Sequence, residues 1–203
     1  MAALRLLTFN VRVGAVDDGP NNWVHRRDLA ALVILDAASD IVALQEPVRW
    51  QLDELLARLP GFDWLGAPRS AAGLAEFSPL LWRAKAMDLL EGGTVWLSET
   101  PSVFGSSSWD SAFPRVATWG RLRVRATGEE LWAASVHLDH VSIPARENAA
   151  RVLARLADEK GAGLPQFLLG DFNSHPGADA THAILREAGF RDAWLEAAER
   201  AGP

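Results

Sequence analysis

The chain has 203 residues, which is enough for one domain with a sizeable core, and its 49% hydrophobic and 23% charged residues are ordinary for a globular protein. Cysteine and tyrosine are absent, so disulfides, thiolate metal sites and a cysteine or tyrosine catalyst are excluded. A net charge of −6 without a basic run argues against a protein that holds long nucleic acid through its phosphates.

Hydrophobic periodicity and turn residues predict alternating strands and helices in the N-terminal half. Apolar runs predict strands at residues 4–13, 40–46, 62–65 and 77–82. Helical spacing predicts helices at residues 23–38 and 48–59, and the turn residues between the first strand and helix predict a loop at 17–22. Residues 86–97 predict a pair of strands around Glu91-Gly92-Gly93.

The C-terminal half begins with a long polar connection at residues 98–114, and connections of that length in compact domains are often functional. A hairpin is predicted from residues 115–125 and 130–138, followed by a helix at 144–159 and a buried strand at 166–170. A loop at 171–177 and helices at 181–187 and 192–200 complete the pattern. The pattern is typical of a mixed α/β or α+β domain.

No apolar run is long enough to cross a membrane. The first seven residues lead directly into a strand-like run and show no signal-peptide pattern. We therefore expect a cytoplasmic protein.

Polar side chains stand at the ends of several apolar strands. Asn10 and Glu46 end two of them, Asp171 and Asn173 follow another, and His137 ends the hairpin. Enzymes often collect catalytic groups at such strand ends, because the scaffold is rigid there and the loops are free. The oxygen donors suit Mg²⁺, which takes one or two carboxylates together with water and substrate phosphate.

Each of these groups also has a structural explanation when it is taken alone. Asn10 fits a turn or cap, Glu46 fits a solvated strand end before Pro47, and residues 171–177 fit a turn. A lone histidine such as His137 is more often structural than catalytic. The order of the motifs along the chain favours the functional interpretation.

Four segments carry that order: Leu-Leu-Thr-Phe-Asn-Val at 6–11, Asp-Ile-Val-Ala-Leu-Gln-Glu at 40–46, Ser-Val-His-Leu-Asp at 135–139, and Leu-Leu-Gly-Asp-Phe-Asn-Ser-His-Pro-Gly at 168–177. Together they resemble the endonuclease/exonuclease/phosphatase (DNase I-like) superfamily. Residues 94–101 and 115–119 resemble spacer motifs of its bacterial branch of metal-dependent phosphoesterases. The resemblance spans residues 4 to about 194.

The resemblance implies roles for the strand-end residues. Asn10 and Glu46 would hold the divalent cation, Mg²⁺ or Mn²⁺. Asp171 and Asn173 would position the attacking water and the scissile phosphate, and His137 would bind the phosphate or assist the leaving group.

Two further residues enter through the same resemblance. Arg115 is a candidate phosphate ligand, although a surface arginine on a strand explains it nearly as well. Glu76 lies in a segment where the family often has an acidic group near its site.

The family pattern is expected to continue past this chain. Its last strands carry an Asp in an Arg-Ile-Asp type of motif and a Ser-Asp-His motif whose histidine is the usual general base, and neither motif occurs here. We therefore expect residues 1–203 to form a single, C-terminally incomplete domain with little or no hydrolase activity. Without those strands, the first strand is expected to be an exposed apolar sheet edge.

The resemblance implies a four-layer α/β/β/α sandwich of the DNase I-like type, and divalent-metal-dependent hydrolysis of a phosphodiester or phosphomonoester. The acidic balance favours a phosphorylated small molecule or lipid head group as substrate. Two alternatives stay open: a non-catalytic binding module of the same fold, and a nuclease acting on nucleic acid.

Overall fold

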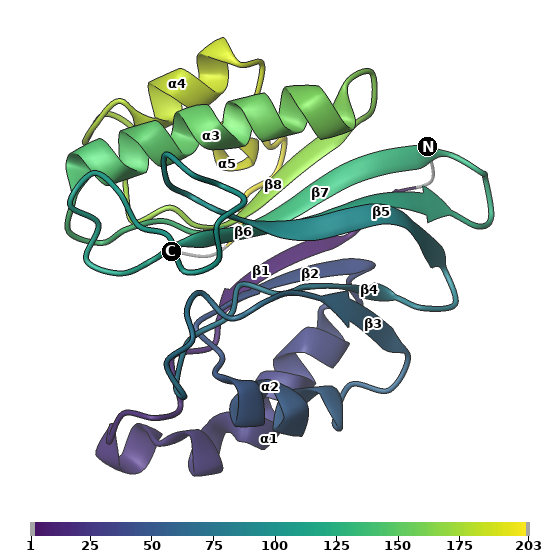
Figure 1. Cartoon of the computed structure of the whole chain (residues 1–203). Coiled ribbons are helices and arrows are strands. Elements are labelled where there is room, and N and C mark those ends of the chain that lie inside the picture. The colour runs from purple at the N-terminus through teal and green to yellow at the C-terminus, as the bar shows by residue number, and fades with distance from the viewer. Residues whose placement is uncertain (1–2, 202–203) are drawn as a thin grey trace.

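The computed structural model describes residues 3–201 and stacks two four-stranded sheets face to face, with helices on both outer faces (Figure 1). The first sheet has the strand order β1-β2-β4-β3, and the second has the order β5-β6-β7-β8. The strands are β1 (Leu6–Asn10), β2 (Ile41–Gln45), β3 (Phe62–Leu65), β4 (Leu80–Arg83), β5 (Met87–Trp96), β6 (Val116–Val124), β7 (Glu130–His137) and β8 (Gln166–Asp171).

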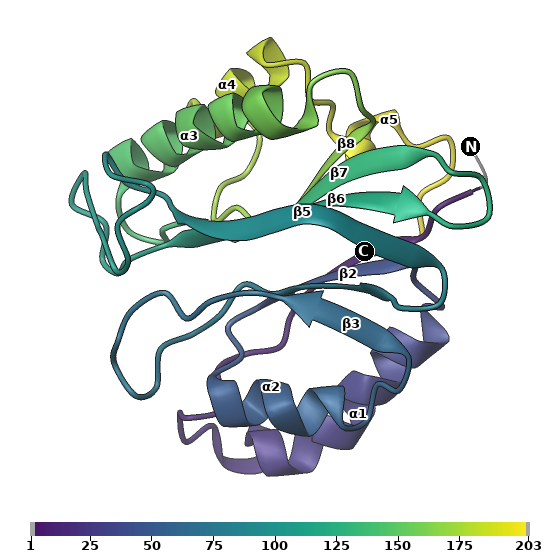
Figure 2. The same ribbon diagram turned by 45° about the vertical axis from the view of Figure 1, so that its right-hand side comes forward.

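The helices form the two outer layers. α1 (Trp23–Asp36) and α2 (Arg49–Leu56) cover the first sheet, whereas α3 (Ile143–Gly161) and α4 (Thr181–Glu187) cover the second (Figure 2). A single 3-10 turn, η1 (Gly19–Asn21), precedes α1, and a short α5 (Ala193–Glu196) follows α4. The predicted four-layer α/β/β/α sandwich is confirmed.

Strand direction determines where the polar strand ends meet. β1 runs parallel to β2, and β7 runs parallel to β8, while the other neighbouring strands pair antiparallel. The carboxyl ends of each parallel pair therefore lie at one edge of their sheet. Asn10 pairs with Gln45 at the first edge, and His137 pairs with Asp171 at the second.

The core between the sheets consists of apolar side chains that alternate toward the inner faces. Ile41, Leu80 and Leu131 belong to one cluster between the sheets and are at most 1% exposed. Close to the polar strand ends, the Ser135 hydroxyl donates a hydrogen bond to the carbonyl of Leu44, at 3.1 Å, and so joins β7 to β2. This buried contact joins the two sheets beside the polar strand ends.

The predicted strand pair at residues 86–97 is wrong, because β5 is one continuous strand. Gly92 does not form a turn: a Cβ atom there would lie 2.7 Å from a Leu65 side-chain atom and 2.8 Å from the carbonyl oxygen of Trp119. Gly92 therefore permits close packing inside β5, and a register shift between Leu89 and Glu91 marks an irregularity in the pairing with β6. The last predicted helix, at residues 192–200, is also shorter than expected, since α5 is one turn.

In the part of the chain that the structure describes, β1 has a neighbour on one side only, so it is an edge strand as predicted, but its leucines are less exposed than predicted. Two of its side chains, Leu6 and Leu7, are half-buried there. Over the same residues, no helix is both long and apolar enough to cross a membrane.

Candidate active site

An acidic centre forms where β1, β2 and β8 end. The Asn10 side-chain amide donates to Glu46 Oε1 at 2.7 Å and to Asp171 Oδ2 at 3.2 Å. Asn10 and Glu46 come from one sheet, and Asp171 comes from the other, 161 positions along the chain from Asn10. The stacking of the sheets thus joins three residues that the sequence predicted separately.

Backbone groups hold the acidic centre in place. Glu46 has φ +72°, a left-handed conformation that turns its carboxylate toward the residues following β1, and its Oε2 accepts from the Val13 amide at 2.8 Å. The Asn10 side-chain oxygen, Oδ1, accepts a hydrogen bond from the Arg12 backbone amide at 2.9 Å. These bonds orient the donor and acceptor sides of the centre before any ligand arrives.

The loop after β8 positions Asp171 through Asn173. The Asn173 amide donates to Asp171 Oδ1 at 2.9 Å, and its side chain donates to the carbonyl of Leu138 at 3.0 Å. Asn173 has φ +46°, which asparagine tolerates better than most residues. Asn173 is therefore close to Asp171, as predicted, and it ties the β8 loop to the end of β7.

The residues of the centre fit a divalent cation. Within residues 3–201, no group of three His, Asp or Glu side chains gathers as a metal cage. Mg²⁺ needs only one or two carboxylates, because water and substrate phosphate complete its six oxygen ligands. Glu46 and Asp171 are two carboxylates that share the Asn10 side-chain amide as a hydrogen-bond donor.

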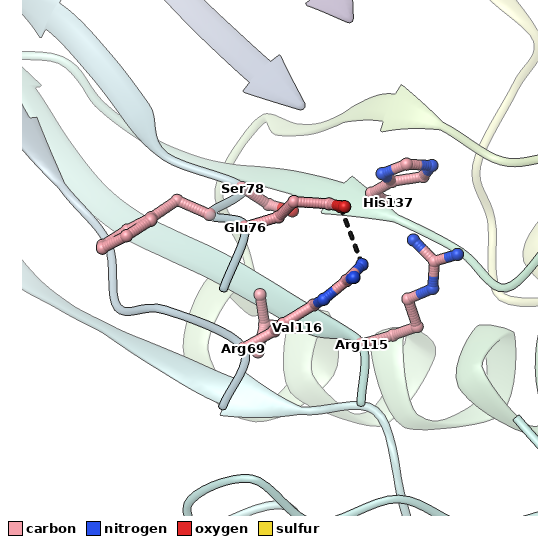
Figure 3. A pocket seen from close by; sticks show the side chains of 7 residues that line it. Arg69, Glu76, Ser78, Arg115, Val116 and His137 are labelled. Atoms are coloured by element: carbon pink, nitrogen blue, oxygen red, sulfur yellow. Dashed lines mark hydrogen bonds and ion pairs between the residues drawn. The ribbon is translucent and has the colours of Figure 1, made fainter. Parts of the chain in front are cut away.

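A small pocket adjoins the acidic centre, and Figure 3 shows the side chains that line it. His137, at the end of β7, connects the two regions, because its Nε2 lies 3.9 Å from Asp171 Oδ2. The pocket is lined by Arg69, Glu76, Phe77, Ser78, Arg115, Val116 and His137. The predicted phosphate ligands Arg115 and His137 therefore lie in one pocket.

Arg115 is a buried cation, and the surface-arginine explanation for it is wrong. Its side chain is 6% exposed, and its Nε lies 3.5 Å from Asp139 Oδ2 without forming a hydrogen bond. Its Nη2 contacts His140 Nδ1 at 2.9 Å. Burial, followed by the nearby charge of Arg69, lowers the pKa of Arg115.

Asp139 anchors the long connection at residues 98–114, which leads into Arg115. Its Oδ2 accepts from the Ser111 hydroxyl and the Ala112 amide, both at 3.0 Å, and its Oδ1 accepts from Ser142 at 2.7 Å. Burial opposes ionisation of Asp139, yet these hydrogen bonds outweigh it and lower its pKa. Asp139 thus holds the end of the 98–114 connection next to the site.

Burial also shifts the pKa values of His137 and Glu76, in opposite directions. Burial and then the charge of Arg115 lower the pKa of His137 to about 4, so this imidazole is neutral at pH 7. Burial raises the pKa of Glu76, although its ion pair with Arg69 opposes that shift. Glu76 lines the same pocket as Arg115 and His137, in the segment that the resemblance singled out.

Sequence reasoning missed Arg69 and the anchoring role of Asp139. Arg69 lies in a Gly-, Ala- and Ser-rich loop with no periodic pattern, so nothing in its neighbourhood indicated the site. Asp139 stood in a quoted motif, but a strand-end carboxylate gives no sign that it accepts four hydrogen bonds from its own surroundings.

An acidic centre beside a pocket lined by two arginines suits the binding of a divalent cation and a phosphate group. Residues 7–198 match the model of the Endonuclease/Exonuclease/phosphatase family, and the chain belongs to that family. Family members hydrolyse phosphoesters. No curated protein matches the chain by sequence.

Solved structures agree with the family assignment. An endonuclease/exonuclease/phosphatase from Bacteroides vulgatus superposes with a TM-score of 0.91 at 33% identity, covering 96% of this chain and 76% of that one. The mannosyl-6-phosphatase of Bacteroides thetaiotaomicron gives a TM-score of 0.85 at 30% identity, covering 91% and 71%. A functionally unknown conserved protein from Enterococcus faecalis gives 0.82 at 29%, covering 89% and 71%.

Proposed function

We propose that this chain carries the metal-binding and phosphate-binding residues of a Mg²⁺- or Mn²⁺-dependent phosphoesterase. The observation that carries the proposal is the meeting of Asn10, Glu46 and Asp171 at the ends of β1, β2 and β8, next to the pocket of Arg115 and His137. Residues from both sheets contribute to this arrangement, so it depends on the face-to-face stacking of the two sheets.

Asn10 and Glu46 would hold the cation, as the family resemblance implies. When bound, the ion supplies Lewis-acid stabilisation of the phosphoryl oxygens. Asp171 accepts two hydrogen bonds in its place between Asn10 and Asn173, and one of its oxygens lies toward His137. Its carboxylate would thereby orient a water molecule for attack on the phosphorus atom.

Arg115 and His137 would contact the phosphate. Phosphoryl transfer depends mainly on positioning and on neutralising the charge of the terminal oxygens. The buried Arg115 brings a positive charge that is fixed by Asp139, and the neutral His137 brings one N–H donor. Asn173 would assist by keeping Asp171 and the β7 end in register.

The three histidines His137, His140 and His182 are poorly suited to act as the base for the attacking water. The lowered pKa of about 4 makes His137 a weak base. His140 is bound to Arg115, and His182 Nε2 lies 3.1 Å from the carbonyl of Ser174. We therefore propose that residues 1–203 alone turn over little substrate, and that a longer chain supplies the base.

A small phosphorylated molecule is the substrate class that we favour. The mannosyl-6-phosphatase neighbour acts on a phosphorylated sugar, by its name, and the net charge of −6 opposes the binding of long nucleic acid. A nuclease and a non-catalytic binding module of the same fold remain the alternatives. The cytoplasmic location stays a prediction.

The test is release of phosphate or nucleotide from a panel of sugar phosphates, p-nitrophenyl phosphate, bis(p-nitrophenyl) phosphate and single-stranded DNA, with Mg²⁺, Mn²⁺ or EDTA. We expect metal-dependent turnover of the small phosphates by the protein that the longest reading frame containing residues 1–203 encodes. Turnover of DNA alone would establish the nuclease. Metal binding without any turnover would establish the binding module.

A further inference from the structure

A second arginine shares the pocket of Arg115. Arg69 comes from the loop between β3 and β4, whereas Arg115 immediately precedes β6. In Figure 3 both guanidinium groups enter the space between Glu76 and His137. The charge of Arg69 is close enough to contribute, after burial, to the lowered pKa of Arg115.

Arg69 is held in one position by contacts on several sides. Its Nη1 donates to Glu76 Oε2 at 2.7 Å, and its guanidinium carbon lies 4.4 Å from the ring centre of Phe113. Its backbone accepts from the Trp96 indole at 2.8 Å and donates to the carbonyl of Glu76 at 2.9 Å. Little side-chain freedom remains to be lost when an anion binds.

Both guanidinium groups retain free hydrogen-bond donors. An arginine has five N–H donors. Among the described residues, the guanidinium of Arg69 donates one side-chain hydrogen bond, to Glu76. Arg115 spends one on His140, and its buried Nε is without a hydrogen bond to any described residue. A buried donor without a partner is costly, so a ligand oxygen that reaches it is stabilised.

The number of terminal oxygens separates the two classes of phosphoester. A phosphomonoester dianion has three terminal oxygens to satisfy, and a phosphodiester monoanion has two together with a second ester group to accommodate. Glu76 and Arg69 have side chains only 16% and 13% exposed, so they close the pocket where a second ester group needs room.

We propose that Arg69 is a specificity-determining residue, which, together with Arg115, selects a phosphomonoester dianion over a phosphodiester. This inference rests on the proposed function, because it uses the same phosphate pocket. Arg69 binds the third terminal oxygen, and Glu76 and Phe113 keep its guanidinium aimed at it.

Binding of two phosphonates that the protein cannot hydrolyse tests the proposal without the need for turnover. The probes are phenylphosphonate, at a pH where it is a dianion, and its monomethyl ester, a monoanion. Their dissociation constants are measured by calorimetry in Mg²⁺ for the wild type, Arg69→Gln and Arg83→Gln. Arg83 is the matched control, because its guanidinium carbon lies 4.2 Å from the ring centre of Phe62, outside the pocket.

We expect the wild type to bind the dianion about 10-fold or more tightly than the ester, since a charge-assisted hydrogen bond contributes on that scale. Arg69→Gln should abolish most of this preference and leave the ester's affinity within about 3-fold, while Arg83→Gln changes neither. A thermal melt of each variant confirms folding, and the double variant Arg69→Gln/Glu76→Gln removes the unpaired carboxylate if Arg69→Gln does not fold.

Equal affinity of the wild type for both probes, or an equal loss of both in Arg69→Gln, overturns the proposal. Those results leave the proposed function standing, provided that probe affinity still requires Mg²⁺ and is lost in Glu46→Gln. Absence of binding by the wild type overturns the monoester pocket, whereas metal-independent binding contradicts the proposed function itself.

Discussion

Gly170 precedes Asp171, which we propose orients the attacking water, and allows β8 to approach β7 closely. Its φ is +155°, and a Cβ atom there would lie 2.1 Å from the carbonyl oxygen of Val136 and 2.6 Å from its side chain. Separations below 3.0 Å require something to move, and here the obstacle is strand backbone. Gly170→Ala must therefore push the end of β8 away from β7.

The cost has two parts, the unfavourable backbone conformation and the overpacking, and together they predict a loss of about 4 kcal/mol in the free energy of unfolding. For a chain of this length, such a loss lowers the melting temperature by roughly 8–16 °C. Because the displaced strand ends at Asp171, whose Oδ2 accepts from Asn10 at 3.2 Å, Mn²⁺ affinity should fall as well.

Urea unfolding followed by tryptophan fluorescence measures the first effect, and calorimetric Mn²⁺ titration measures the second. Gly73→Ala is the control: a Cβ atom there meets nothing within 4 Å, so its stability should stay within about 0.5 kcal/mol of the wild type. A loss below about 1 kcal/mol for Gly170→Ala would refute the close approach of β7 and β8.

Three other perturbations probe the site and its support. His137 has a pKa near 4 in the folded chain and an ordinary value of 6.5, so the unfolded chain binds more protons between those values and stability is lost as the pH falls from 6.5 to 4. His137→Asn should remove up to about 3 kcal/mol of that pH dependence in urea unfolding, and an unchanged profile would contradict the buried neutral imidazole. Asp179 is 1% exposed and accepts from Arg146 at 2.8 Å, so Asp179→Asn should cost about 3–5 kcal/mol by thermal melting, whereas Asp53→Asn, in an exposed pair, should cost under about 1 kcal/mol. Glu46→Gln should weaken Mn²⁺ binding by about 10-fold or more in a calorimetric titration, and wild-type affinity would place the ion elsewhere.

Motif order predicted much of the fold and the acidic centre. The strand ends at Asn10, Glu46 and Asp171 could be identified because polar residues interrupt apolar runs there, and the family resemblance joined them. The distances that make them one centre depend on the face-to-face packing of the two sheets, which no local pattern contains.

Other features depend on long-range packing and could not be predicted. In the sequence, Gly92 is indistinguishable from a turn glycine. Only the close approach of Leu65 and Trp119 shows why a glycine is needed at this position inside a strand. Arg69 sits in a loop without periodicity, and its position becomes clear only when the connection carrying Phe113 folds over it.

The central claim is metal-dependent phosphoester hydrolysis at Asp171. The most direct measurement is p-nitrophenyl phosphate turnover with Mg²⁺, Mn²⁺ or EDTA, by residues 1–203, by the longest reading frame that contains them, and by its Asp171→Ala variant. We predict metal-dependent turnover by the longer chain, near-zero rates for residues 1–203, and loss of activity in Asp171→Ala of at least about 100-fold. Undiminished turnover by Asp171→Ala, or equal rates with EDTA, would contradict the claim.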